Sequence, residues 1–179
     1  MPLVLLIGGA RSGKSQLAVR LAAEQGSPVV FLATAQAGDQ EMAERIARHR
    51  DERSTSWQTI EEPLRLAETI AAVATGACLV IDCLTLWTAN ALEALGTEAT
   101  QKEAPAAASL AAARSGLTVA ISNEVGLGIV PDNPLARGYR DLLGRVNTRW
   151  ADAADRVLLL VAARALVLDA PDSLLEGLR

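Results

Sequence analysis

Short, uninterrupted runs of apolar residues recur along the chain, and most are separated by longer stretches in which apolar residues return every three or four positions. Short runs are typical of strands buried on both faces, and the longer spacing is typical of helices. The predicted strands cover residues 3–7, 29–33, 78–82 and 117–122, with a short extended segment at 57–59. The predicted helices cover residues 15–25, 39–50, 63–75, 84–95 and 134–154. This alternation indicates an α/β fold with a mostly parallel central sheet and helices on both faces.

Three segments depart from this simple alternation. Residues 157–162 and 165–168 are β-like but too close together for a crossover helix, so they predict an antiparallel hairpin at the sheet edge. Its apparent turn, Ala163 and Arg164, lacks the glycine that tight hairpin turns favour. Residues 96–108 are polar and then alanine-rich, and we expect a loop or partly ordered stretch there, leading into a helix that ends near Arg114. A short terminal helix is predicted after residue 169.

The segment between the first strand and the first helix reads GGARSGKS and matches the P-loop pattern G-x-x-x-x-G-K-[ST] at every specified position. Glycines let backbone N–H groups turn inward around a phosphate chain, while Lys14 reaches the outer phosphates and the Ser15 hydroxyl binds Mg²⁺. A turn that merely connects the two elements is disfavoured, because the lysine, the hydroxyl and the flanking elements all agree. The predicted nucleotide-binding residues of the loop are Gly8, Gly9, Ala10, Arg11, Ser12, Gly13, Lys14 and Ser15.

Polar residues follow several of the predicted strands. Asp82 ends an apolar run in the Walker B pattern, in which a carboxylate at the sheet edge contacts Mg²⁺, often through water. The alternative is an ordinary acidic strand end or helix cap, but the P-loop in the same chain favours the magnesium role. Ligands of open parallel sheets collect at the carboxyl ends of the strands, so we expect Thr34, Gln36 and Glu124 at the same edge.

Composition and charge limit the class of protein. Nothing in the 179 residues marks a linker, which predicts one domain over residues 1–179. A formal net charge of -4 argues against a general nucleic-acid binder, which needs a basic surface. Cys78 and Cys83 lack metal-ligand spacing and are predicted to be reduced and structural. Without a signal-like N-terminus or a run of about 18 uncharged apolar residues, we expect a soluble, cytoplasmic protein.

Residues 45–57, RIARHRDERSTSW, contain His49, the only histidine of the chain. The arginines here can form a solvated helix face, and a lone histidine is more often a surface or capping residue than a catalyst. Composition and spacing therefore leave the role of His49 open.

An ordered set of motifs resembles the adenosylcobinamide kinase / adenosylcobinamide-phosphate guanylyltransferase family of cobalamin biosynthesis. The motifs are GGARSGKS at 8–15, ATA at 33–35, RIARHRDER at 45–53 with Trp57, DCLTLW at 82–87 and SNEVGLGIVP at 122–131. The last motif continues through Asn133, LAR at 135–137, YRD at 139–141 and GRVN at 144–147. A P-loop alone is shared by many families, whereas this set spans nearly the whole chain in order and is specific.

The resemblance implies a bifunctional enzyme with a RecA-like P-loop fold. Such an enzyme phosphorylates the aminopropanol hydroxyl of adenosylcobinamide with ATP or GTP, and then transfers GMP from GTP to adenosylcobinamide phosphate. The implied catalytic residues are Lys14 and His49, of which His49 becomes bonded to GMP, and the implied Mg²⁺ site is Ser15 with Asp82. Members of this family assemble as homo-oligomers, commonly trimers. The nucleotide contacts implied outside the P-loop are Ala33, Thr34, Ala35, Arg50, Asp51, Glu52, Arg53, Glu61 and Asp82.

These residue types suit the implied chemistry. A neutral imidazole nitrogen can attack the α-phosphorus of GTP and form a phosphoramidate, and nearby arginines disfavour the protonated ring and stabilise phosphoryl charge. In the kinase step, Lys14, the loop amides and a metal held by Ser15 and Asp82 position the γ-phosphate for in-line attack by the substrate hydroxyl. Glu124 is a candidate base or positioning group.

Two other functions stay open at this stage. One is a small-molecule P-loop kinase in which residues 45–57 only bind substrate or cap a helix. The other is a nucleotide-regulated binding module whose oligomer, rather than turnover, carries the function. The sequence also leaves open the preference between ATP and GTP, whether one pocket serves both reactions, and which residues bind the corrinoid.

Overall fold

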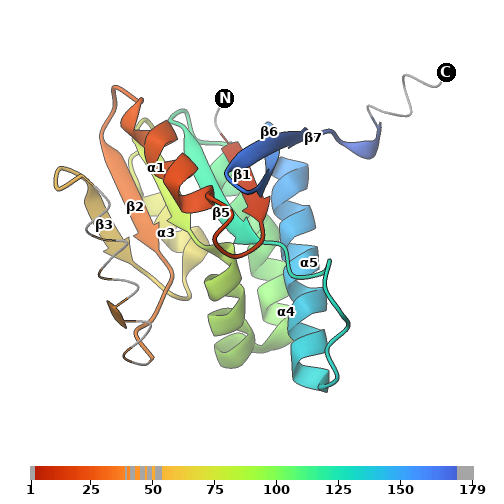
Figure 1. Ribbon diagram of the computed structural model, residues 1–179. Helices are drawn as coiled ribbons and strands as arrows, with labels where there is room; N and C mark the ends of the chain where they lie inside the picture. Colours follow the sequence, from red (N-terminus) through yellow and green to blue (C-terminus); the bar gives the residue numbers. More distant parts are fainter. Residues whose placement is uncertain are drawn as a thin grey trace.

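A seven-stranded sheet runs through the molecule, and helices cover both of its faces (Figure 1). The computed structural model describes residues 3–38, 40, 43–44, 47, 50 and 54–172. Along the sheet the strands follow the order β3-β2-β4-β5-β1-β6-β7. Every neighbouring pair is parallel except β6 with β7, which confirms the mostly parallel sheet with an antiparallel pair at one edge. The strands are β1 (Leu3–Gly8), β2 (Val29–Ala33), β3 (Gln58–Glu61), β4 (Cys78–Asp82), β5 (Thr118–Asn123), β6 (Arg156–Val161) and β7 (Arg164–Leu168).

Each face of the sheet has its own hydrophobic core, because successive residues of a strand point to opposite faces. Leu3 and Leu5 of β1 belong to the core that also contains side chains of α3, α4 and α5. Val4 and Leu6 of the same strand belong to the core that contains side chains of α1. Burial on both faces explains why β1 reads as an uninterrupted apolar run. The helices are α1 (Lys14–Ala23), α3 (Leu66–Ala72), α4 (Leu84–Ala112) and α5 (Pro134–Ala153).

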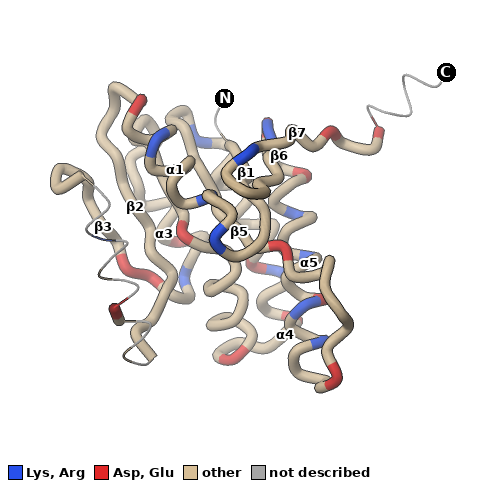
Figure 2. Tube along the Cα trace, viewed as in Figure 1, with Lys and Arg blue, Asp and Glu red and all other residues tan. Residues whose placement is uncertain are grey.

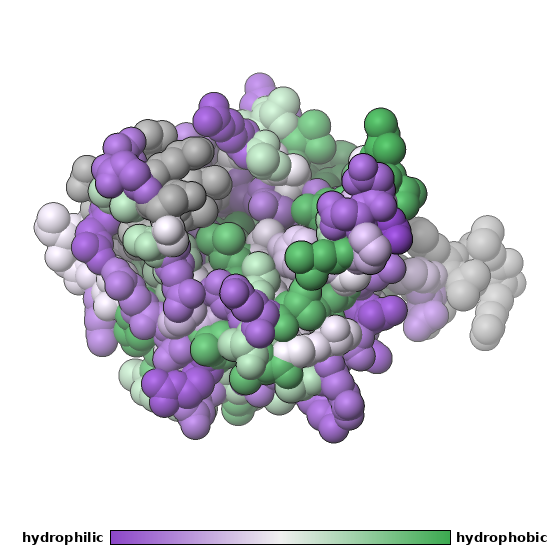
Figure 3. All heavy atoms as spheres, turned by 90° about the horizontal axis from the view of Figure 1, so that it is seen from below, coloured by the Kyte–Doolittle hydropathy of each residue, from purple (hydrophilic) through white to green (hydrophobic). Residues whose placement is uncertain are grey.

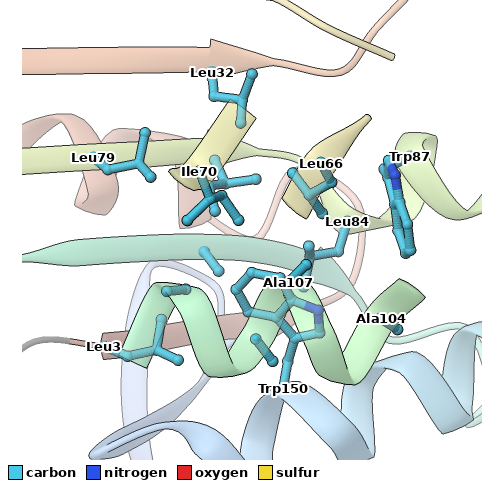
Figure 4. Packing of buried hydrophobic residues seen from close by; sticks show 14 of the residues in the cluster. Leu3, Leu32, Leu66, Ile70, Leu79, Leu84, Trp87, Ala104, Ala107 and Trp150 are labelled. Carbon is cyan, nitrogen blue, oxygen red and sulfur yellow. The ribbon is translucent and has the colours of Figure 1, made fainter. Parts of the chain in front are cut away.

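Two fully buried tryptophans anchor the larger core, among aliphatic side chains from the sheet and the helices (Figure 4). Trp150 comes from α5, and Trp87 comes from the first turn of α4. The indole Nε1 of Trp87 donates a 2.9 Å hydrogen bond to the carbonyl oxygen of Leu64. Trp87 therefore also fixes the segment that follows β3.

The prediction of a loop at residues 96–108 is wrong. These residues lie within α4, whose backbone departs from helical geometry at Gly96, with φ 81° and ψ 173°. Four alanines of the second part, Ala104, Ala107, Ala108 and Ala111, are buried. Alanine has the highest helix propensity, and its small side chain lets helices pack closely. The low complexity that suggested a loop is therefore the composition of a closely packed helix.

The C-terminal hairpin is confirmed, with its turn one residue earlier than predicted. Ala162 and Ala163 occupy the turn, with φ 49° and 57°, whereas the sequence pointed to Ala163 and Arg164. Positive φ at both positions is the geometry of the two-residue turns that match the twist of a hairpin. The helix predicted at 63–75 is shorter, since α3 begins at Leu66 and ends at Ala72. The predicted helix at 39–50 and the terminal helix fall largely outside the described residues.

Acidic and basic residues are interspersed over the helices and the connecting segments (Figure 2). Within the described part of the chain, no helix has the length and apolar character needed to span a membrane.

Candidate active site

The P-loop joins the end of β1 to the start of α1, at the carboxyl edge of the sheet (Figure 1). Close contact with the C-terminal hairpin requires glycine at two of its positions. A Cβ at Gly8 would lie 2.3 Å from the carbonyl oxygen of Leu160, and a Cβ at Gly13 would lie 3.2 Å from Ala163. Gly13 also has φ +99°, which side chains rarely adopt. The glycines therefore serve the fold of the loop as well as its approach to phosphate.

The Lys14 side chain lies against the P-loop rather than in solvent, with only 6% of its surface exposed. Its Nζ donates to the carbonyl oxygens of Gly8 at 2.9 Å and Gly9 at 2.6 Å, and to the Ser12 hydroxyl at 3.3 Å. The ammonium charge is held directly over the loop and beside the N-terminus of α1, where both charge and helix dipole attract phosphate.

Asp82 ends β4 at the same edge of the sheet, and it is half-buried. One strand, β5, separates β4 from the P-loop strand β1. Asp82 and the half-buried Ser15 of α1 supply a carboxylate and a hydroxyl, the hard oxygen donors that Mg²⁺ prefers. Among the described residues there is no group of three or more His, Cys, Asp or Glu that could hold a metal ion. This donor set fits a nucleotide-bound Mg²⁺, which takes one or two protein ligands and completes its shell with phosphates and water.

Thr34 connects the ends of β2 and β4. Its fully buried hydroxyl donates to the carbonyl oxygen of Cys83 at 2.7 Å and accepts from the Cys83 N–H at 2.9 Å. The Thr34 carbonyl in turn accepts from Asn90 of α4 at 2.9 Å. Thr34 therefore holds the chain next to Asp82, and direct contact with nucleotide stays a prediction for it and for its neighbours Ala33 and Ala35.

Arg50 and Glu61, two predicted nucleotide contacts, form an ion pair between exposed side chains. Glu61 ends β3, and in the sheet register it lies opposite Ala33 of β2, which lies opposite Asp82 of β4. The pair therefore brings Arg50 to the same edge as the P-loop and Asp82. The predicted site residues His49, Asp51, Glu52 and Arg53 lie outside the described residues.

Neither cysteine takes part in a disulfide, in agreement with the prediction that both are reduced. Cys78 and Cys83 are free and buried. Burial raises the pKa of Cys83 to about 11, and the charge of Asp82 acts in the same direction. Burial also raises the pKa of Cys78 to about 11, against a smaller opposing effect of Arg114.

Sequence reasoning missed a group of buried and half-buried polar side chains behind this edge. Ser122 and Asn147 are buried, and the Ser122 hydroxyl donates to Asn147 Oδ1 at 2.6 Å. Nearby, the Tyr139 hydroxyl donates a 3.0 Å hydrogen bond to the carbonyl oxygen of Thr85. All four residues lie within the motifs quoted for the family, but a motif does not show which backbone group a side chain reaches.

Comparison with known proteins finds relatives that match over most of the chain. A family model described as cobinamide kinase / cobinamide phosphate guanyltransferase matches residues 4–168. A protein of Pseudomonas aeruginosa named bifunctional adenosylcobalamin biosynthesis protein CobP is 46% identical over 165 residues, which cover 92% of this chain and 95% of that protein. A protein of Salmonella typhimurium named bifunctional adenosylcobalamin biosynthesis protein CobU is 40% identical over 174 residues, covering 89% of this chain and 96% of that protein.

Among solved structures, an ATPase of a bacterial type III secretion system shares the fold. The TM-score is 0.53 with 12% sequence identity, and the match covers 98% of this chain and 54% of that chain. Similarity at this identity concerns the fold alone, and it agrees with the predicted α/β architecture.

Proposed function

The chain belongs to the cobinamide kinase / cobinamide phosphate guanyltransferase family, and we propose that both reactions take place at the carboxyl edge of its sheet. It is an enzyme of adenosylcobalamin biosynthesis with kinase and guanylyltransferase activities. The substrates we propose are adenosylcobinamide and its phosphate, with ATP or GTP as phosphate donor and GTP as GMP donor. The observation that supports this most directly is that the P-loop, Asp82 and the Arg50–Glu61 pair share one edge.

In the proposed kinase step the protein positions a phosphate chain and stabilises its charge. The backbone N–H groups of the P-loop surround the β-phosphate. Lys14 keeps its bond to the Gly8 carbonyl and exchanges its bonds to Gly9 and Ser12 for the β- and γ-phosphates. Mg²⁺ held by Ser15 and Asp82 would neutralise charge that develops on the phosphates. The substrate hydroxyl then attacks the γ-phosphorus in line, the bond to the β–γ bridging oxygen breaks so that ADP or GDP leaves, and the hydroxyl proton is released to solvent. Glu124, whose side chain accepts from the Gly126 N–H, is a candidate to orient that hydroxyl.

In the proposed guanylyl transfer His49 forms a covalent intermediate. An imidazole nitrogen attacks the α-phosphorus of GTP, and pyrophosphate leaves. The phosphate oxygen of adenosylcobinamide phosphate then attacks the same phosphorus, the P–N bond breaks, and adenosylcobinamide-GDP is released. Arg50, directly after His49 in the chain, reaches Glu61 at the sheet edge, which supports placing His49 near the nucleotide. Asp51, Glu52 and Arg53 are proposed nucleotide contacts of the same segment.

Covalent labelling tests this mechanism. Wild-type protein incubated with GTP labelled at the α-phosphate should acquire label that is lost in acid and retained in alkali, as expected of a phosphoramidate. His49→Ala should acquire none and lose guanylyl transfer, while phosphorylation of adenosylcobinamide continues at least in part, since that step has no enzyme-bound nucleotide. Label on His49→Ala protein, or acid-stable label on wild type, would place the intermediate elsewhere.

The same experiment separates the two alternative functions. A P-loop kinase without guanylyl transfer would phosphorylate adenosylcobinamide but take up no label from α-labelled GTP. A binding module would bind GTP and do neither.

We also propose that the chain forms a homo-oligomer, and a trimer by analogy with the family it resembles. Apolar side chains stand exposed on two segments: the connection from β5 into α5, with Leu127, Ile129, Val130 and Leu135, and strand β7, with Leu166 and Val167. The view of the carboxyl edge in Figure 3 shows hydrophobic residues among the polar ones. Exposed apolar surface beside a site fits a second copy of the chain or the corrinoid. Light scattering after size-exclusion chromatography, with and without adenosylcobinamide, measures the assembly directly.

A further inference from the structure

Asn147 is a buried polar residue on the otherwise apolar inner face of α5. Only 6% of its surface is exposed, and its neighbours on that face are Leu143, Val146 and Trp150. Its Oδ1 accepts the Ser122 hydroxyl at 2.6 Å, and its Nδ2 donates to the carbonyl oxygen of Asn123 at 3.1 Å. Burying an amide is costly unless both its ends are hydrogen-bonded, and here both are. Because the Nδ2 group donates to the backbone of Asn123, loss of this hydrogen bond would remove a contact that fixes the end of β5.

The peptide groups of Asn123 are held from two sides. Its carbonyl oxygen accepts from Asn147, and its N–H donates to the Thr85 hydroxyl at 2.7 Å. Thr85 is in the first turn of α4, and its carbonyl accepts the Tyr139 hydroxyl of α5. The end of β5 is therefore fixed between two helices at the point where it reaches the P-loop.

The next residue makes the contact with the P-loop. The N–H of Glu124 donates to the carbonyl oxygen of Gly8 at 3.1 Å. The same carbonyl oxygen accepts from Lys14 Nζ at 2.9 Å. A shift of the Asn123–Glu124 peptide would therefore move the Gly8 carbonyl at the start of the P-loop, and with it Lys14.

We infer that Asn147 is a positioning residue for phosphoryl transfer: through Asn123 and Glu124 it sets the Gly8 carbonyl and the Lys14 ammonium. The inference rests on the proposed role of Lys14. Asn147 is buried, with both ends of its amide bonded inside the protein, and it acts through the backbone of β5. Its effect should therefore be on the rate of the chemical step, which depends steeply on geometry, more than on nucleotide affinity.

Asn147→Asp is the sharpest variant, because it keeps the size and the Oδ1 acceptor but replaces the donor to Asn123 with an oxygen. We expect kcat of the kinase reaction to fall at least about tenfold, with the KM for nucleotide changed less than about threefold. Val146→Ala is the matched control, since Val146 is equally buried on the same helix and carries no polar contact. It should lower Tm but leave kcat within about twofold of wild type.

Thr85→Ala provides a second variant, because it removes the hydroxyl that accepts a hydrogen bond from the Asn123 N–H. It should reproduce the loss of kcat, and it carries the test if Asn147→Asp does not fold. All rates are measured well below the Tm of each variant. If either folded variant keeps wild-type kcat, or if activity falls only in proportion to Tm as in Val146→Ala, the inference is wrong. Lys14→Ala distinguishes the two proposals: an active Lys14→Ala refutes the role of Lys14, whereas an inactive one beside a fully active Asn147→Asp refutes only the role of Asn147.

Discussion

The backbone N–H of Ala163 donates a 2.9 Å hydrogen bond to the carbonyl oxygen of Ser12, so the turn between β6 and β7 lies on the P-loop. Gly13 packs against the same turn, because a Cβ there would be 3.2 Å from the Cα and Cβ of Ala163. The C-terminal hairpin is therefore part of the support of the nucleotide site, although it lies at the opposite end of the chain.

This contact predicts that Gly13→Ala destabilises the protein even without nucleotide. The substitution places a side chain at φ +99° and against Ala163, and a residue forced into the left-handed region costs about 1–2 kcal/mol. The free energy of unfolding in urea, measured without ligand, should fall by at least that amount. Gly9→Ala is the control, since a Cβ there meets nothing within 4 Å. Equal stability of the two variants would show that the hairpin does not constrain Gly13.

Lys14→Ala should reduce the kinase rate by at least about a hundredfold, because it removes the charge that stabilises the transferred phosphate. The lysine is buried, but its bonds to the Gly8 and Gly9 carbonyls tie it to the loop and not to the hydrophobic core, so Tm should change little. Arg20→Ala, an exposed basic residue of the same helix, is the control for loss of charge on α1. A normal rate in Lys14→Ala would refute the role of the P-loop in catalysis.

The strands and the P-loop could be predicted because each is encoded locally. Leu3 to Ile7 is apolar at every position because both faces of β1 are covered. The P-loop motif comes directly after this run in the sequence. The helix at 96–108 could not, because its stability depends on Ala104, Ala107 and Ala108 packing against helices that are distant in sequence. Local composition carries no record of that packing.

The candidate site shows the same division. Strand ends identified Asp82 and Thr34 as neighbours, since parallel strands end at one edge, whereas Glu61 was implied only by the family resemblance. The pattern did not show that the Thr34 hydroxyl would be used to hold Cys83, or that Asn147 would reach the backbone of Asn123. Such bonds depend on the depth and orientation of each side chain, which only the packed structure defines.

Asp82→Asn should weaken the dependence of both reactions on Mg²⁺. The substitution keeps the shape of the side chain but removes the formal charge that attracts the metal, so a higher Mg²⁺ concentration should be needed for half-maximal rate. Titration of each activity with Mg²⁺ measures this change. Asp155→Asn is the control, because Asp155 lies at the other end of β1 and accepts from the Leu3 N–H at 3.1 Å. An unchanged Mg²⁺ titration in Asp82→Asn would leave Asp82 as an ordinary strand-end residue.

The two cysteines provide a prediction about pH. Burial raises the pKa of both Cys78 and Cys83 to about 11 from 9.0, so at pH 8 they stay protonated in the folded protein. Because the thiolate is the reactive form, a thiol reagent such as dithionitrobenzoate should react with neither in the native state and with both in guanidinium.

Between pH 9 and pH 11 the unfolded chain loses these protons while the folded chain keeps them, so the free energy of unfolding should fall as the pH rises through that window. In Cys78→Ala/Cys83→Ala protein this fall should be shallower, although Tyr139, whose pKa is raised to about 12 by burial, still contributes. A native thiol that reacts rapidly at pH 8, or an identical pH slope in the double variant, would contradict the burial of these groups as the cause.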